Sequence, residues 1–419
     1  MAKGASALPG FRDFYPDEFA ARAHIQNTWR DVARRFGFVE YDGPPLEPLE
    51  LYTKKSGAEI VGQLYNFKDK GERDVALRPE MTPTFARMVG ARANALPKPV
   101  RWFSIPQLFR YERQQKGRLR EHFQLNVDIV GEADVSADAE LLAVAVECMA
   151  AFGLGAEDVK ARVSDRRLLV AILKSLHVGD DKMPDVFAVI DKLDRQPREV
   201  SLEKLREAGA SAAAAERLVG LKDLHGVDAI AGAFPDAGVS ARLDEFRRYL
   251  GFVAALGVGD WLVVDLTVVR GLAYYTGIVF ELFDAQGEFR AICGGGRYDT
   301  LLAALGGADL PALGFGMGDV VLGELLKARG KLPSTAPALD YWVAYEDPAS
   351  LAKAMQIATA LRQSAKSVEY SLHHVQLGKQ LKSASSAGAA RAIILRQDGK
   401  EVVKDLATGD EKPFTFADG

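Results

Sequence analysis

The stretch from residue 81 to residue 120 carries the charges best suited to bind a polyanion. It contains nine lysines and arginines but a single acid, Glu112. Guanidinium groups match phosphate oxygens in shape and charge, so this stretch predicts a polyanion site, with a solvated basic face as the alternative. The spacing favours a site. In FRYERQQKGRLREHFQ (109–124) two strand-like segments flank the turn QQKG and place Arg110 and Glu112 on one face of the first.

Two further segments combine residues that could contact a small molecule. VVRGLAYYTGIVFE (268–281) places an arginine and two tyrosines, Tyr274 and Tyr275, after an apolar strand. A tyrosine pair can form the wall of a site for an aromatic or imidazole ligand, but buried tyrosines are more often structural, which is the interpretation that the residues alone support. CGGGRYD (293–299) has three glycines in a row, as expected where the backbone must approach a ligand or strand closely.

Composition limits the classes of protein to which the chain can belong. The 419 residues, 48% hydrophobic and 26% charged, predict two or three soluble globular domains with a formal net charge of −4. The two cysteines, Cys148 and Cys293, are too far apart in sequence for a thiolate zinc motif, and the six histidines lack ligand spacing. No bound metal, no membrane segment and a reducing cytoplasmic location are therefore expected.

The elements that must position these residues follow from hydrophobic periodicity. Residues 16–36 and 137–152 have the periodicity of helices, and short alternating segments between 59 and 129 predict an antiparallel sheet. Residues 167–257 read as successive helices inserted into a strand-rich region, after which WLVVDLTVV, YTGIVFELF and FRAICGG resume the strand pattern. A polar, proline-containing stretch (330–337) precedes a final unit that alternates strands and helices.

Five motifs in this order resemble the histidyl-tRNA synthetases, a family of class II aminoacyl-tRNA synthetases. They are LRPEMT (77–82), 109–124, 268–281, CGGGRYD and GFGMGD (314–319). FGFVEYDGPPLE (36–47) resembles the class II dimer motif, and LGKQLKSASSAGAARAIIL (377–395) is similar to the family's anticodon-binding domain. The resemblance implies an α/β (α+β) fold: a class II antiparallel sheet flanked by helices, an all-helical insertion and a C-terminal α/β domain. The domains expected are a catalytic core in two parts (1–166 and 259–330), the helical insertion (167–258), a linker (331–338) and the anticodon-binding domain (339–419).

The family activates L-histidine with ATP and transfers it to the 3'-terminal ribose of tRNA(His). The resemblance places Arg110 and Arg270 at the α-phosphate as catalytic residues, where charge concentrates during in-line attack. It assigns Arg118 to the outer phosphates and Glu112 to the adenine side. Either His122 or Phe123 stacks on adenine, because neighbouring strand residues face opposite ways. Mg²⁺ is expected to accompany ATP.

The resemblance also assigns the pocket for the histidine substrate. The ammonium group is expected to bind Glu80, Thr82 and Gln124, and Arg270 also holds the substrate's carboxylate. The imidazole is expected to meet Asp128 and Tyr275, beside Tyr274. A buried polar group left unpaired costs roughly 1–3 kcal/mol, so these partners would exclude apolar amino acids.

Three positions depart from the family pattern. The family commonly has a glutamate where Asp128 stands and an acid where Ala273 stands. Its third class II motif usually ends in an arginine that clamps ATP, whereas Val321 stands near that position here. We interpret these departures as a subtype of the family, similar to the plant-type enzymes.

The resemblance implies a homodimer, through Pro44 of the dimer motif, and tRNA(His) as a partner. Lys379 and Lys382 are candidates for contact with the tRNA, or else solvated residues on a helix surface. The chief alternative function is the histidine-sensing regulatory subunit of ATP phosphoribosyltransferase. An RNA-binding or polymerase-accessory protein that has kept the fold without the chemistry is a third possibility. Retention of the 268–281 motif and of the C-terminal domain favours the enzyme.

Overall fold

The structure is a computed structural model that describes residues 7–53, 62–112, 117–269, 275–305, 307–333 and 339–415. The chain forms two compact units that divide chiefly between Leu332 and Pro333. Within these described ranges, no helix has the length and apolar character needed to cross a bilayer.

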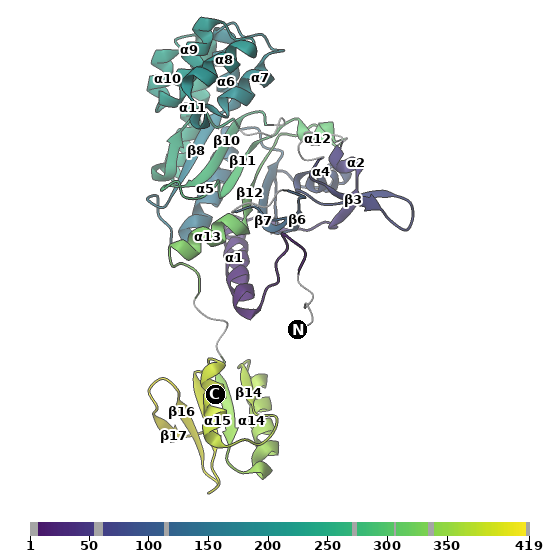
Figure 1. Cartoon of the computed structure of the whole chain (residues 1–419), viewed down its shortest axis with the longest axis vertical. Coiled ribbons are helices and arrows are strands. Elements are labelled where there is room, and N and C mark those ends of the chain that lie inside the picture. Colours follow the sequence, from purple (N-terminus) through teal and green to yellow (C-terminus); the bar gives the residue numbers. More distant parts are fainter. Residues whose placement is uncertain are drawn as a thin grey trace. The chain divides into compact units, whose positions relative to one another are not determined.

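A nine-stranded mixed sheet forms the centre of the first unit (Figure 1). Its central strands pair antiparallel, as expected, while β1 and β9 add short parallel pairs at the two edges. The sheet confirms the predicted fold class. In spatial order the strands are β1 (Val39–Glu40), β5 (Val100–Ser104), β7 (Glu121–Val130), β12 (Ala312–Gly318), β11 (Cys293–Arg297), β10 (Ile278–Asp284), β8 (Val159–Asp165) and β9 (Leu262–Val264), with β6 (Gln107–Phe109) paired to β7.

The strand pattern of residues 59–129 does not form one sheet. Its first part belongs to a separate three-stranded antiparallel sheet of β2 (Leu46–Pro48), β4 (Asp74–Leu77) and β3 (Tyr65–Lys68). Only β5, β6 and β7 join the central sheet. The expected strand WLVVDLTVV is also shorter than predicted, since β9 covers three residues and the chain then turns. Alternation within a strand does not reveal which sheet receives it.

The side chains of strand β7 alternate between the two faces of the central sheet. Leu125, Val127 and Ile129 are fully or almost fully buried and belong to the main apolar core. His122 and Gln124, earlier on the same strand, face the opposite side, where they line a pocket. This two-residue period places hydrocarbon on one face and chemistry on the other.

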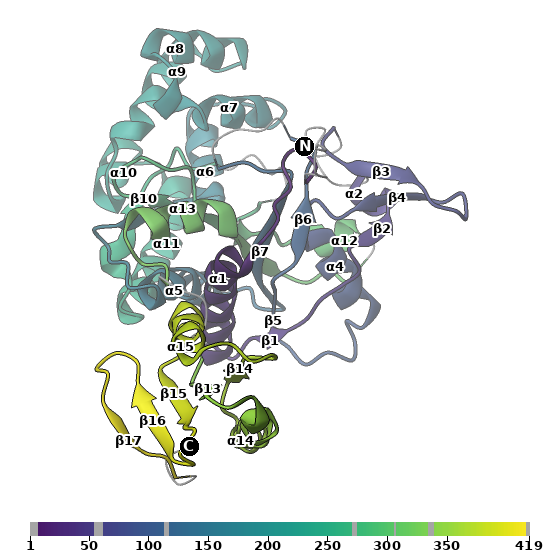
Figure 2. The same ribbon diagram turned by 60° about the horizontal axis from the view of Figure 1, so that its bottom comes forward.

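Three helices form the layer on the apolar face (Figures 1 and 2). Asp134 caps the second of them, since its side chain accepts a hydrogen bond from the backbone N–H of Ser136 at 2.9 Å. Helix α5 is buried along most of its length because it lies between the sheet and helix α11. The three helices are α1 (Pro16–Arg35), α5 (Val135–Ala151) and α13 (Asp319–Ala328).

A buried ion pair ties β11 to α5. Arg297 is fully buried, and its guanidinium bonds to the carboxylate of Asp138, with an Nε–Oδ2 distance of 3.1 Å. The same guanidinium donates to the backbone carbonyl of Glu132 at 2.9 Å. These bonds compensate for the desolvation of both charges.

The remaining elements of the first unit are helical. The segment between β8 and β9 contains the successive helices that were predicted, with Leu243 and Phe246 among its fully buried residues. Its helices are α6 (Arg166–Ser175), α7 (Met183–Ile190), α8 (Arg198–Glu207), α9 (Ala212–Val219), α10 (Val227–Ala233) and α11 (Ala237–Ala255), with short 3₁₀ turns η1 (Leu193–Arg195), η2 (Gly220–Asp223) and η3 (Gly259–Trp261). Around the small sheet lie α2 (Glu50–Thr53), α4 (Thr82–Ala91) and α12 (Leu301–Ala304).

The second unit is a five-stranded sheet with its own apolar cores. Parallel strands β13, β14 and β15 are joined through helices, and β16 and β17 extend the sheet antiparallel. This is the alternation predicted for the end of the chain. The elements are β13 (Tyr341–Tyr345), η4 (Pro348–Ser350), α14 (Leu351–Gln363), β14 (Val368–Tyr370), α15 (Leu377–Ser386), β15 (Arg391–Leu395), β16 (Glu401–Asp405) and β17 (Glu411–Pro413).

Candidate active site

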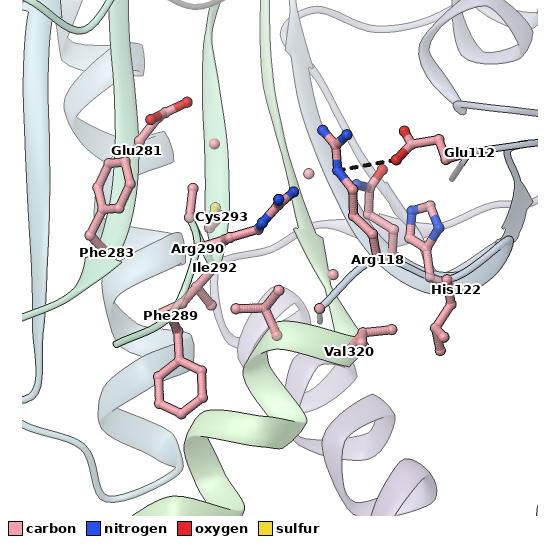
Figure 3. A pocket seen from close by; sticks show the side chains of 18 of the residues that line it. Glu112, Arg118, His122, Glu281, Phe283, Phe289, Arg290, Ile292, Cys293 and Val320 are labelled. Atoms are coloured by element: carbon pink, nitrogen blue, oxygen red, sulfur yellow. Dashed lines mark ion pairs between the residues drawn. The ribbon is translucent and has the colours of Figure 1, made fainter. Parts of the chain in front are cut away.

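A pocket of about 820 Å³ lies on the polar face of the central sheet. Gly294 and Gly316, which pair with each other across β11 and β12, leave its floor without side chains. Strand β7 forms one wall and β10 the other, with Glu281 on the β10 side (Figure 3). The gap between two side-chain-bearing strands is therefore a consequence of the glycines.

The connection from β6 to β7 brings three predicted site residues to the pocket. Arg110, Glu112 and Arg118 all line it. The Nε atom of Arg110 donates to the backbone carbonyl of Pro79 at 2.9 Å, and Arg118 Nε lies 3.1 Å from Glu112 Oε2 (Figure 3). Residues 113–116 lie outside the described ranges. Of the nine basic residues in the stretch 81–120, Arg110 and Arg118 are those that the structure places along the pocket within its described ranges.

Of the two candidates to stack on adenine, only His122 lines the pocket. Burial and the charges of Arg110 and Arg12 lower the pKa of His122 to about 3, so its imidazole is neutral at pH 7. The ring of Phe123 lies on the opposite face of β7, beside Phe14 and 4.7 Å from the guanidinium carbon of Arg22. The period of the strand separates the two rings.

The amide of Gln124 lies next to the pocket floor. A Cβ atom at Gly316 would approach Gln124 Cδ to 2.8 Å, which is closer than real Cβ contacts. Gly316 therefore leaves room for the Gln124 side chain. The predicted ammonium-binding group is held where it can reach a ligand on the glycine floor.

Asp128 lies further along the same face of β7 and is buried. Its Oδ1 accepts a hydrogen bond from the hydroxyl of Tyr298, the residue that follows β11. Desolvation raises the pKa of Asp128 to about 7, while the bond from Tyr298 acts in the opposite direction. A side chain at Gly314, which is paired with Asp128, would overlap this carboxylate.

The other predicted histidine-binding residues that the structure describes are not among those that line the pocket. Tyr275 is 6% exposed and shares an apolar cluster with Tyr298. Glu80 is buried, and Thr82 begins helix α4. Arg270 and Tyr274 lie outside the described residues.

Comparison with known proteins identifies the family. A family described as histidyl-tRNA synthetase matches residues 10–318. The histidine–tRNA ligase of Opitutus terrae is 46% identical over 97% of this chain and 94% of its own length. The chloroplastic/mitochondrial histidine–tRNA ligase of Arabidopsis thaliana is 39% identical over 98% of this chain and 85% of its own.

The chain belongs to the histidyl-tRNA synthetase family. A crystal structure of histidyl-tRNA synthetase from Nostoc sp. PCC 7120 has the same fold, with a TM-score of 0.85 at 24% sequence identity. The alignment covers 98% of this chain and 96% of that one.

The start of α13, near which the third-motif arginine was expected, is apolar. Val320 and Val321, at the start of α13, line the pocket. Two contacts of Asp319 hold the start of the helix in place. Its Oδ2 lies 3.0 Å from an Arg12 guanidinium nitrogen, and its Oδ1 accepts the backbone N–H of Phe123 at 2.9 Å. The α13 wall therefore presents hydrocarbon to a ligand.

The sequence motifs did not indicate several residues in or near the pocket. Tyr298 is the tyrosine of CGGGRYD, to which the resemblance assigns no role. It comes two residues after Gly296 and four after Gly294, so the alternation of β11 directs it to the same face of the sheet as these glycines. Glu281, Arg195 and Arg290 also line the pocket. Arg195 comes from the helical segment, and no local pattern indicates its approach.

The loop with the dimer-motif proline is anchored from beneath. Arg78 is 5% exposed, and its NH1 atom donates to Asp42 Oδ1 at 2.7 Å and to the Gly43 carbonyl at 2.8 Å. Pro44 itself is exposed. The structure fixes the backbone of this loop and leaves the proline at the surface.

The two lysines predicted to contact tRNA lie side by side in the second unit. Lys379 and Lys382 of α15 line a groove of about 580 Å³ together with Trp342 of β13 and Glu369. The indole nitrogen of Trp342 is buried without a hydrogen-bond partner among the described residues. The groove combines an aromatic side chain with two cations.

No group of three or more histidine, cysteine, aspartate or glutamate side chains with the geometry of a metal site occurs in the described part of the chain. Glu112 and Glu281 are the carboxylates that line the pocket.

Proposed function

We propose that the chain is a histidine–tRNA ligase. It activates L-histidine with ATP to histidyl-adenylate and pyrophosphate, and then transfers histidine to the 3'-terminal ribose of tRNA(His). One observation carries this function: the 46% identity to a histidine–tRNA ligase, which extends over 97% of the chain and so includes both units.

The first step places a carboxylate oxygen of histidine on the α-phosphorus of ATP. A carboxylate–phosphate bond forms, the bond between the α-phosphorus and the bridging oxygen breaks, and pyrophosphate leaves with that electron pair. Arg110, whose Nε donates to the Pro79 carbonyl, is the residue within the described ranges that we assign to the α-phosphate. We assign Arg118 to the outer phosphates and retain Arg270 as a second α-phosphate ligand from the family resemblance.

His122 supplies the surface for adenine. Its pocket-facing ring is neutral at pH 7, and a neutral ring stacks on a base without bringing an extra charge beside Arg110. We assign Glu112 to the adenine side, where its ion pair with Arg118 holds both side chains at the pocket wall.

Recognition of the histidine side chain rests on Asp128. Above pH 7 its carboxylate accepts the imidazole N–H, while Tyr298 keeps the carboxylate oriented. We assign Tyr275 and Tyr274 to the imidazole, and Glu80, Thr82 and Gln124 to the ammonium group. An apolar amino acid would leave Asp128 buried and unpaired, a penalty that can produce discrimination of about 10⁴-fold.

Mg²⁺ would enter bound to the ATP phosphates, because this ion dehydrates reluctantly and usually keeps several waters. Its chemistry is to neutralise phosphate charge. The carboxylates available at the pocket are Glu112 and Glu281, which fits a metal held mainly by its nucleotide.

A division of labour follows for the domains. We propose that residues 1–166 and 259–330 form the catalytic core, 167–258 an inserted helical domain, 331–338 a linker and 339–419 the anticodon-binding domain. The groove at Trp342, Lys379 and Lys382 supports the last assignment, since an aromatic ring can stack on a base while lysines contact phosphates.

We also propose a homodimer in a reducing cytoplasm. Near Pro44 the strand residues Val39 and Leu46 are 62% and 37% exposed, and such hydrophobic side chains suit a self-complementary interface. Both cysteines are buried thiols outside disulfides, as in proteins of reducing compartments. Light scattering on the wild type and on Val39→Lys tests the dimer, with Phe67→Lys as an exposed control on β3. A monomeric wild type would contradict it.

Aminoacylation tests the function itself. Purified protein should attach labelled histidine to tRNA(His) only when ATP is present, and Arg110→Ala should abolish charging while the protein stays folded. Histidine binding without charging or adenylate formation would instead support the regulatory-subunit alternative.

A further inference from the structure

Arg290 is a pocket cation whose position no motif predicts. Arg290 lies on the connection between β10 and β11 and lines the pocket from the side opposite β7. In Figure 3 its side chain extends from the β10–β11 side towards the wall that carries Arg118. The α13 wall between them contributes Val320 and Val321.

The backbone near Arg290 is anchored to the sheet. Ile292, two residues further on, donates its N–H to the Leu282 carbonyl at 2.8 Å and accepts the Gly318 N–H at 3.3 Å. Its side chain is 2% exposed. Arg290 is exposed and immediately precedes this fixed segment, so the backbone from which its side chain extends is constrained.

The charges of the lining residues indicate what Arg290 can bind. Among the described residues, four arginines and two glutamates line the pocket, which is an excess of two positive charges with His122 neutral. The charge of Arg118 is partly offset by Glu112 at 3.1 Å. A triphosphate carries several negative charges, so a further cation facing the Arg118 wall can add to the charge that Mg²⁺ and the other arginines supply at its outer end.

We propose that Arg290 is a nucleotide-binding residue that grips the β- and γ-phosphates of ATP. It performs, from the β10–β11 connection, the clamping that the apolar start of α13 cannot supply. This inference rests on the proposed function only in requiring ATP as the substrate. It assigns a substrate-contacting role to a position outside every motif of the sequence.

Binding and exchange measurements on Arg290→Ala test the proposal. A charge-assisted hydrogen bond lost from such a site weakens binding by about tenfold to a hundredfold. We therefore expect the Kd of a non-hydrolysable ATP analogue, and the KM for ATP in pyrophosphate exchange, to rise by about that factor. The Kd of AMP and the KM for histidine should stay within about twofold, because neither ligand has outer phosphates.

Controls separate a phosphate contact from a structural effect. Arg290→Lys should show a smaller loss than Arg290→Ala, since it keeps the charge but not the fork. Arg242→Ala removes an arginine on the surface of α11, outside the pocket, and should leave both nucleotides unaffected. The Tm of Arg290→Ala should match that of the wild type.

Two outcomes would overturn the assignment. One is unchanged affinity of Arg290→Ala for the ATP analogue; the other is an equal loss of affinity for the analogue and for AMP. Either result with an active wild type leaves the proposed function intact. A wild type that neither binds ATP nor exchanges pyrophosphate would remove the proposed function, and the assignment with it.

Discussion

The hydroxyl of Tyr298 donates a hydrogen bond to Oδ1 of Asp128 across the intervening strand β12. Both side chains are buried, and Gly314 of β12 leaves the space in which the carboxylate lies. This pair places one acceptor, with a pKa of about 7, further along β7 than the pocket-lining His122 and Gln124. We propose that the selection of histidine depends on it.

Asp128→Asn should raise the KM for histidine by a factor that depends on pH. At pH 8 the wild-type carboxylate is mostly ionised, whereas at pH 6 only about a tenth is. The ratio of variant to wild-type KM should therefore be about tenfold larger at pH 8 than at pH 6. Because both KM values at a given pH refer to the same histidine solution, the ionisation of free histidine cancels in their ratio. A ratio independent of pH would show that Asp128 does not accept the imidazole.

Tyr298→Phe should move the pH dependence of kcat/KM for histidine to higher pH. The hydrogen bond from Tyr298 opposes the burial that raises the pKa of Asp128, so its removal should raise that pKa above about 7. Tyr341→Phe, in the second unit, is a matched control that should leave the profile in place. A profile for Tyr298→Phe that coincides with the wild type would contradict the role of the pair.

The raised pKa of Asp128 also makes the stability of the protein depend on pH. The pKa of Asp128 is raised in the folded state, so its ionisation opposes folding progressively as the pH rises from about 4 to about 7. Asp128→Asn keeps an acceptor for Tyr298 and removes the ionisation. Its free energy of unfolding, relative to the wild type, should be higher at pH 8 than at pH 5. Denaturant titrations at the two values would measure this, and a smaller relative value at pH 8 would contradict it.

Arg297→Met should cost about 3–5 kcal/mol in the free energy of unfolding, because it leaves Asp138 buried without its cation. Arg242→Met breaks an exposed pair with Glu245 on α11 and should cost less than about 1 kcal/mol. Thermal or denaturant unfolding of the two variants gives the comparison. Equal losses would mean that the buried pair contributes no more than a surface pair.

The double variant Lys379→Ala and Lys382→Ala should reduce tRNA charging while leaving pyrophosphate exchange unchanged. Both lysines lie in the second unit, whereas the candidate active site lies in the first. Lys353→Ala, on α14, is the control. Undiminished charging by the double variant would argue that the groove beside Trp342 does not bind tRNA.

Periodicity predicted the type of most elements but not their partners. The helix predicted at 16–36 forms α1 (Pro16–Arg35), and the succession of helices after residue 167 is present. The strand pattern before residue 129, by contrast, divides between two sheets. Alternating side chains record burial on one face, and the pairing of strands depends on contacts distant in sequence.

The candidate site was likewise predicted only where its residues lie close together in the sequence. The clustered arginines and Gln124 were predicted because they lie within one motif. His122 was the positional candidate of the two neighbouring rings, and the structure shows that His122 lines the pocket while Phe123 lies beside Arg22. Arg195 and Arg290 reach the pocket from a helical segment and a strand connection, so their approach depends on tertiary structure.

Pyrophosphate exchange with each of the twenty amino acids offered separately tests the central claim most directly. The purified protein should exchange labelled pyrophosphate into ATP with histidine alone, because we propose that Asp128 accepts the imidazole N–H of the substrate. Arg110→Ala should abolish the exchange without unfolding the protein. Exchange with another amino acid in preference to histidine, or none with any of them, would contradict the account.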